Sequence, residues 1–238
     1  MRLVRSLNRV VLRFWFAAEF TRFISQQPRP DLTEPVTVYG PQEVRVLIIG
    51  AGLGVGYGTR TAEDALPGQL ATELHASLHR GIRVDTQVEI ARPLRATVRD
   101  LLQRPALGYD LIIYTPAFGE AYHGHTAAWS KQLRALIAAT QAGNHSPSLV
   151  LTGLPTPRVK RPIERIALEH ATRVNQAIQV SAVSTSSAYA AAPTYATPST
   201  YRIFDPDHYQ QLAHSIAQTA ATLLGQSQRT ESPNPSTV

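Results

Sequence analysis

The side chains whose types and spacing could bind a metal ion gather in one short segment. Glu120, His123 and His125 form a Glu-x-x-His-x-His cluster, and two histidines beside a carboxylate can ligate zinc when they project from one strand. Gly119 and Gly124 instead indicate a loop, and no third histidine lies near in the sequence. We therefore expect a polar loop here and predict neither a metal nor a cofactor.

A second candidate is a run of glycines that follows an aliphatic segment. Residues 44–49 (VRVLII) are typical of a buried strand. Residues 50–56 (GAGLGVG) follow without a hydroxyl, carboxylate, imidazole or amine group. In α/β proteins the loop after such a strand is where ligands bind, so backbone N–H groups would have to do the binding, as in an anion nest. A nucleotide- or anion-binding protein is therefore one function that this loop allows.

The spacing of the glycines argues against a dinucleotide site. The fingerprint is G-x-G-x-x-G, or the same pattern ending in alanine, and the frame that begins at Gly50 has Val55 in its sixth position. The frames that begin at Gly52 and Gly54 end in tyrosine and threonine. Residues 57–67 contain glycine, aspartate and proline, so no helix begins directly after the loop to receive a pyrophosphate.

Strands and helices alternate along the middle of the chain. Strands are expected at 44–49, 83–90, 111–115 and 148–152, and helices at 66–79, 97–103, 128–142, 163–181 and 209–224. Such alternation predicts a three-layer α/β/α sandwich with a parallel sheet, as in flavodoxin-like folds. The serine-, alanine- and tyrosine-rich residues 184–198 are expected to be irregular. The expected domain spans residues 44–224.

The two ends of the chain differ from this domain. Within residues 1–27, Arg2, Arg5, Arg9 and Arg13 recur at three- and four-residue spacing, which predicts a basic amphipathic helix that either lies on an anionic membrane surface or packs on the domain. This segment is too charged to span a membrane and has no convincing signal-peptide cleavage site. Residues 28–43 form a proline-rich linker, and residues 225–238 a disordered tail.

Composition narrows the classes of partner. The 238 residues have a formal net charge of +6, which favours loose association with anionic surfaces. Aromatic residues make up 7% and are not interleaved with basic ones, so we expect no nucleic-acid binding. The chain has no cysteine, which excludes a disulfide framework or a thiolate nucleophile. We expect a cytoplasmic or peripherally membrane-associated protein.

Taken in order, segments across this domain resemble the blocks of bacterial SGNH (GDSL-type) hydrolases. The segments that carry the resemblance are the strand 46–49 with the helix start 66–71 (LPGQLA), then 89–102, 109–115, 149–155 and 173–178. Together they cover most of residues 44–224. The resemblance implies an SGNH-type α/β/α fold, an esterase- or lipase-like relative, and a small ester or acyl ligand.

The family's functional positions, however, carry the wrong side chains here. The family uses a serine nucleophile, a histidine base and an aspartate that orients the histidine. Gly52 stands at the serine position, and Arg95 and Gly119 stand at the oxyanion-hole glycine and asparagine. Three separate losses predict a pseudoenzyme that works as a binding module. The alternative is an active esterase with a non-standard mechanism, in which His208 or His123 activates a water molecule.

The last block allows two alignments. Asp205 and His208 have the D-x-x-H spacing of the family's catalytic pair. The other alignment places Asp205 at the histidine position and removes the base, and we favour it because Pro206 and Tyr209 then both match. Independently of any family, an Asp-Pro-Asp turn before a helix is typical of an N-cap. We expect this capping turn rather than a working catalytic pair.

Overall fold

We describe the protein from a computed structural model. It describes residues 26–119, 126–142, 146–157, 162–185, 187–192, 194–195 and 204–231, together with residues 18 and 22. The polar loop that we expect around His123, and nearly all of the predicted N-terminal helix, lie outside these residues. Within them no helix is long and apolar enough to cross a membrane, and no three metal-ligating side chains cluster.

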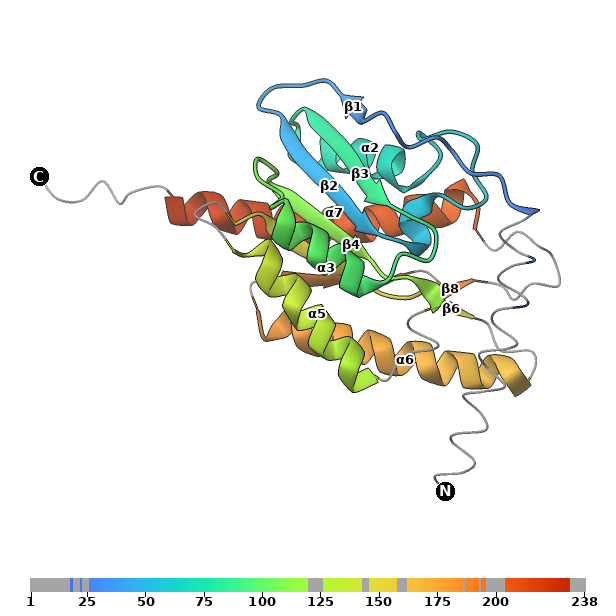
Figure 1. The fold of residues 1–238 in the computed structure, drawn as a ribbon. Coiled ribbons are helices and arrows are strands. Elements are labelled where there is room, and N and C mark those ends of the chain that lie inside the picture. Colours follow the sequence, from blue (N-terminus) through green and yellow to red (C-terminus); the bar gives the residue numbers. More distant parts are fainter. Residues whose placement is uncertain are drawn as a thin grey trace, which may run out of the picture.

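A six-stranded sheet forms the centre of the molecule (Figure 1). Its order is β1-β3-β2-β4-β5-β7, built from β1 Val36–Val38, β2 Val44–Gly50, β3 Ile82–Val88, β4 Leu111–Thr115, β5 Ser148–Thr152 and β7 Ser187–Ala190. Every neighbouring pair is parallel except β1 with β3, which is antiparallel. The sheet is therefore mixed, with the predicted parallel strands and one antiparallel edge strand.

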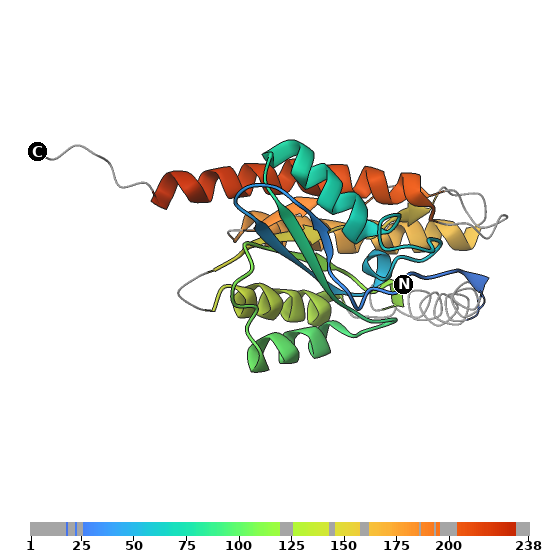
Figure 2. The same cartoon turned by 90° about the horizontal axis from the view of Figure 1, so that it is seen from above.

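Helices cover both faces of this sheet (Figure 2). Helices α2 Leu66–Leu78 and α7 Pro206–Glu231 pack together on one face, and α3 Leu94–Gln103 and α5 Thr126–Thr140 on the other. Helix α6 Pro162–Val183 packs beside α5. The strands β6 Thr156–Pro157 and β8 Thr194–Tyr195 form a separate parallel pair. The predicted α/β/α architecture is thus confirmed.

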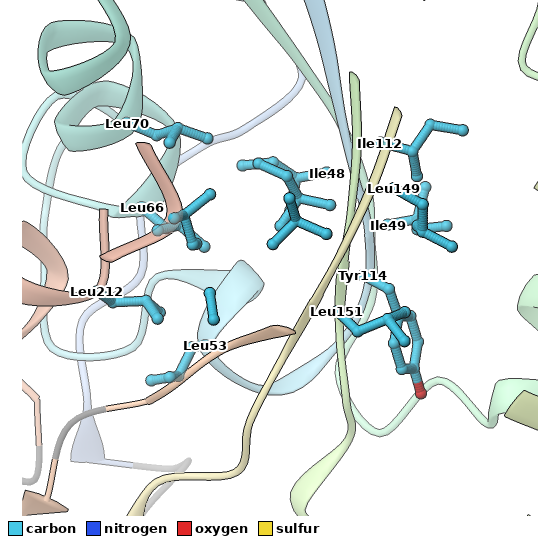
Figure 3. Close-up of a cluster of buried hydrophobic side chains, with 14 of the residues drawn as sticks. Ile48, Ile49, Leu53, Leu66, Leu70, Ile112, Tyr114, Leu149, Leu151 and Leu212 are labelled. Atoms are coloured by element: carbon cyan, nitrogen blue, oxygen red, sulfur yellow. The ribbon is translucent and has the colours of Figure 1, made fainter. Parts of the chain in front are cut away.

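Burial on both faces explains why the central strands are apolar along their whole length. Figure 3 shows Ile48 on the side of the sheet that faces Leu66 of α2 and Leu212 of α7, whereas Ile49 and Ile112 lie on the opposite side. All five of these side chains are buried. Neighbouring residues of one strand therefore stabilise two different layers.

Two strands of the central sheet lie where the sequence predicted none. Strand β1 falls in the predicted linker 28–43, because its Val-Thr-Val residues favour an extended edge strand and the prolines stay outside it. Strand β7 falls in the stretch 184–198 that was expected to be irregular. There the residues Ser-Ala-Tyr-Ala give little sign of a strand, and the strand is stabilised by its pairing with β5.

The last helix also differs from its predicted end. Helix α7 continues to Glu231, so residues 225–231 are helical and do not belong to the predicted tail. A single glycine in a helix costs only about 1 kcal/mol relative to alanine. The neighbouring residues with good helix propensity can therefore keep Gly225 within the helix.

Candidate functional site

The glycine loop lies at the carboxyl end of β2, where α/β proteins place their sites. After Gly50 the chain forms a short 3-10 helix, η1, at Gly52–Val55. The N–H of Ala51 donates to the Thr115 carbonyl at 2.9 Å. In return the buried Thr115 hydroxyl donates to the Ala51 carbonyl at 2.8 Å and lies 3.2 Å from the Ile49 carbonyl. The loop is therefore tied on both sides to the end of β4.

The backbone of this loop leaves no room for side chains at two of its glycines. Gly52 has φ of +57°, and a Cβ placed on it would lie 2.3 Å from the carbonyl oxygen of Pro116. Gly50 has φ of +110°, and a Cβ there would lie 2.2 Å from the Thr115 carbonyl. Both conformations disfavour any residue other than glycine. Position 52, which the resemblance aligns with the family's serine, thus has neither a side chain nor space for one in this backbone.

The N–H groups of the loop are largely used within the loop and its neighbours. Those of Ala51, Gly54 and Gly56 donate to the carbonyls of Thr115, Ala51 and Leu53 at 2.9, 3.0 and 3.2 Å. Residues 51–57 are buried. An anion nest needs N–H groups that point to a ligand, and three of this loop's donors already have backbone partners.

The structure brings Asp205 and His208 together at the start of α7. One carboxylate oxygen of Asp205 accepts the backbone N–H of His208 at 3.1 Å and lies 2.6 Å from Nδ1 of its ring. The first contact is the N-cap that the Asp-Pro-Asp turn predicts. The second is the orientation that the D-x-x-H alignment requires. The side chains of Asp205 and His208 are 48% and 24% exposed.

The electrostatic state of Asp205 follows from these contacts. Burial acts to raise its pKa, but the hydrogen bonds from the ring and backbone of His208 outweigh burial and hold the pKa below its ordinary value. The carboxylate is therefore ionised at neutral pH and available to orient the imidazole.

A stack of aromatic rings lies between the glycine loop and the histidine. Phe118 and Phe204 stack with ring centroids 5.8 Å apart, and the edge of His208 meets Phe204 at 6.2 Å. A Cβ on Gly52 would lie 3.7 Å from Phe118. Both phenylalanines are buried. Buried apolar rings thus bridge the two regions that would form an SGNH active site.

The remaining predicted positions contribute little to this region. Arg95 lies exposed in the first turn of α3, and its side chain has no hydrogen bond or ion pair to any residue that the structure describes. Gly119 follows Phe118 directly and is half-buried.

Comparison with solved structures identifies the fold. A carbohydrate acetylesterase family member from Sinorhizobium meliloti superposes with a TM-score of 0.60 and 14% identity over 76% of this chain and 99% of that one. The aryl esterase of M. smegmatis has a TM-score of 0.56 and 16% identity, over 76% of this chain and 99% of the esterase chain. Axe2, an acetylxylan esterase from Geobacillus stearothermophilus, has a TM-score of 0.59 and 14% identity, over 76% of this chain and 95% of the Axe2 chain.

The chain has the fold of SGNH-type esterases. No protein-family model and no curated protein matches the sequence. At these identities the likeness establishes the architecture, and the chemistry has to be argued from the residues of this chain.

The structure also reveals a feature of this SGNH-type fold that the sequence analysis missed. Arg92 lies beside β3 in the wall of a polar cleft, with a side chain only 11% exposed and ion pairs to Glu89 and Asp100. The spacing of these charges along residues 89–100 was the available signal. The same residues also resemble the second block of the family, and that resemblance does not indicate a cleft.

Proposed function

We propose that this protein is a non-catalytic relative of SGNH-type esterases that acts as a binding module. The observation that carries the proposal is the steric environment of Gly52. A Cβ at this position would lie 2.3 Å from the Pro116 carbonyl, and real Cβ atoms do not approach a carbonyl oxygen so closely. An acyl-enzyme requires a nucleophilic side chain, which this position cannot hold in the observed backbone.

The surroundings of the loop support the same conclusion. Oxyanion stabilisation needs preorganised donors directed at one point, whereas Gly119 offers no side-chain donor and Arg95 is exposed on α3. The stacked rings of Phe118 and Phe204 occupy space beside the loop. An ester carbonyl would find neither a nucleophile nor the family's side-chain donor here.

The test is hydrolysis of short-chain aryl esters by the purified full-length protein. We expect the unmodified chain to turn over the ester no faster than an equal amount of a His208→Ala variant. The variant is the reference because other histidines on a protein surface also hydrolyse such esters slowly. Turnover that is robust in the unmodified chain and lost in His208→Ala would overturn the proposal.

One observation favours a second candidate, an esterase with a non-standard mechanism. Nδ1 of His208 lies 2.6 Å from Asp205, so a carboxylate-oriented imidazole is present that could activate a water molecule. This candidate predicts that ester hydrolysis falls in both His208→Ala and Asp205→Ala. The binding-module proposal predicts that neither change affects the background rate.

We further propose that residues 1–27 contact an anionic membrane surface. The support is the stripe of arginines at positions 2, 5, 9 and 13, since clustered cations are attracted to anionic lipid. Co-sedimentation of the full-length chain with vesicles that contain phosphatidylserine should fall when these four arginines are replaced by glutamine. Equal sedimentation of the two proteins would contradict the proposal.

A further inference from the structure

A cleft of about 1120 Å³ lies beside the degenerate loop. It is bounded by residues 27–33, by the carboxyl end of β3 at residues 86–89, and by residues of α3 and its end. Its lining includes neither Gly52 nor His208. The cleft has the size of a site for a small organic ligand, and it does not depend on the state of the esterase-like site.

Arg92 is held rigidly in the wall of this cleft. Its guanidinium pairs with Glu89 in the preceding turn and with Asp100 of α3, and its Nε is buried without a hydrogen-bond partner among the described residues. Ala91, the residue before it, has φ of +54°. That left-handed conformation is disfavoured for a residue other than glycine. Such backbone strain is found preferentially where a side chain must be placed for a function.

The charged groups of the cleft fall into two classes. The carboxylates have partners: Glu89 and Asp100 pair with Arg92, and Asp31 accepts the N–H and hydroxyl of Thr33 at 3.0 and 2.8 Å. The side chains of Arg29 and Arg104 are exposed and have no hydrogen-bond or ion-pair partner in the part of the chain that the structure describes. The charged donors left for a ligand are therefore these two guanidinium groups.

We propose that this cleft binds a hydroxyl-rich small anion, a sugar that carries a carboxylate or a phosphate. Arg29 and Arg104 take the anionic group, because guanidinium groups bind both kinds of anion through paired hydrogen bonds. The side chains of Gln87 and Gln103, which also line the cleft, offer both donors and acceptors to hydroxyl groups.

The charge balance of the cleft supports a ligand larger than a bare anion. Three arginines (Arg29, Arg92 and Arg104) face three carboxylates (Asp31, Glu89 and Asp100), so the lining has no net charge. A bare inorganic anion would gain from the two open guanidinium groups and lose to the carboxylates. A sugar gains in addition from hydrogen bonds between its hydroxyls and the carboxylate oxygens.

Calorimetric titration of the full-length protein with four probes tests the proposal. We expect glucose 6-phosphate or glucuronate, or both, to bind with a dissociation constant of about 1 mM or tighter. Which of the two binds more tightly distinguishes phosphate from carboxylate. Glucose and inorganic phosphate should each bind at least about tenfold more weakly, since each lacks one of the two sets of contacts.

Single substitutions then locate the site. Arg29→Gln and Arg104→Gln should each weaken the tighter ligand by about tenfold or more. Arg134→Gln is the matched control, because Arg134 is also an exposed arginine but lies on α5 and outside the lining. The proposal is overturned by the absence of binding of either anionic sugar, by equal binding of glucose or phosphate, or by an equal response of all three variants.

Discussion

Two regions that the family resemblance assigns to one site, the end of β2 and the start of α7, differ in what they hold. At the end of β2 the backbone leaves no space for a side chain, with the Pro116 oxygen 2.3 Å from any Cβ on Gly52. At the start of α7 an aspartate and a histidine are paired, with 2.6 Å between Nδ1 of His208 and a carboxylate oxygen of Asp205. The first region is closed to a side chain, and the second holds an assembled pair.

The two regions differ because each stabilises the fold in its own way. Asp205 accepts the backbone N–H of His208 at 3.1 Å and so caps α7, which is worth about 1 kcal/mol without any catalysis. The glycine loop, by contrast, is stabilised by packing against β4 and would lose that packing with a serine. The presence of the pair is therefore weak support for catalysis, and the closed space at Gly52 is strong support against it.

The largest effect is expected from Gly52→Ser, which would place a serine at the position that the family resemblance aligns with the nucleophile. We expect it to lower the free energy of unfolding by roughly 2–4 kcal/mol, because the new Cβ meets the Pro116 carbonyl and φ of +57° disfavours serine. We also expect no gain in ester hydrolysis. Urea unfolding and an aryl ester assay measure the two quantities.

Gly225→Ala is the matched control for this substitution. A Cβ at Gly225 meets no atom within 4 Å, and the residue lies within α7, so alanine should stabilise the protein by up to about 1 kcal/mol. A Gly52→Ser variant as stable as the unmodified chain would show that the loop can open to accept a side chain.

The next effect concerns the contact that ties the loop to β4. Thr115→Val removes the hydroxyl that donates to the Ala51 carbonyl at 2.8 Å and should cost about 1–2 kcal/mol in urea unfolding. Thr97→Val is the control, because the Thr97 hydroxyl is buried without a hydrogen-bond partner among the described residues. The second substitution should be neutral or stabilising. Equal losses in both variants would mean that the Thr115 hydrogen bond does not hold the loop.

Much of the fold could be predicted from the sequence because its signals are local. The continuous apolar run 44–49 and the leucines spaced four residues apart in α2 each report burial through their own composition. Strand β1 has only three residues that favour a strand, and β7 has no continuous apolar run. Their order comes from pairing with β3 and β5, which lie far from them along the chain.

The candidate site shows the same division between local and distant causes. The sequence shows a glycine at position 52, and the family resemblance aligns this position with a serine. The lack of space for a side chain there could not be predicted, because the obstructing carbonyl belongs to Pro116, far along the chain. The cleft was missed for a similar reason. Arg29, Gln87 and Arg104 come from three separate segments, and only the folded chain brings them to one lining.

A smaller effect separates capping from catalysis at Asp205. Asp205→Ala should cost about 1 kcal/mol because α7 loses its N-cap, whereas Asp205→Asn should cost only a few tenths, since asparagine caps equally well. Thermal or urea unfolding measures both. Asp207→Ala serves as a control for the loss of an acidic group from the first turn of α7. Equal losses in Asp205→Ala and Asp205→Asn would show that the charge on the carboxylate, rather than its capping bond, supports the helix.

The smallest effect is the pH dependence of the same residue. The contacts with His208 place the pKa of Asp205 below its ordinary value of 3.8, so in the folded protein the ionised form is favoured relative to the unfolded chain. This stabilisation is fully present above the unfolded pKa and is lost as the pH falls through the folded pKa. Between about pH 5 and about pH 3 the unmodified chain should therefore lose more unfolding free energy than Asp205→Asn, whose side chain does not titrate. Asp207→Asn removes a neighbouring carboxylate without touching the pair, and its curve should follow that of the unmodified chain more closely. If the curves of Asp205→Asn and the unmodified chain run parallel, the retained pair contributes no charge-dependent stability, and capping alone accounts for Asp205.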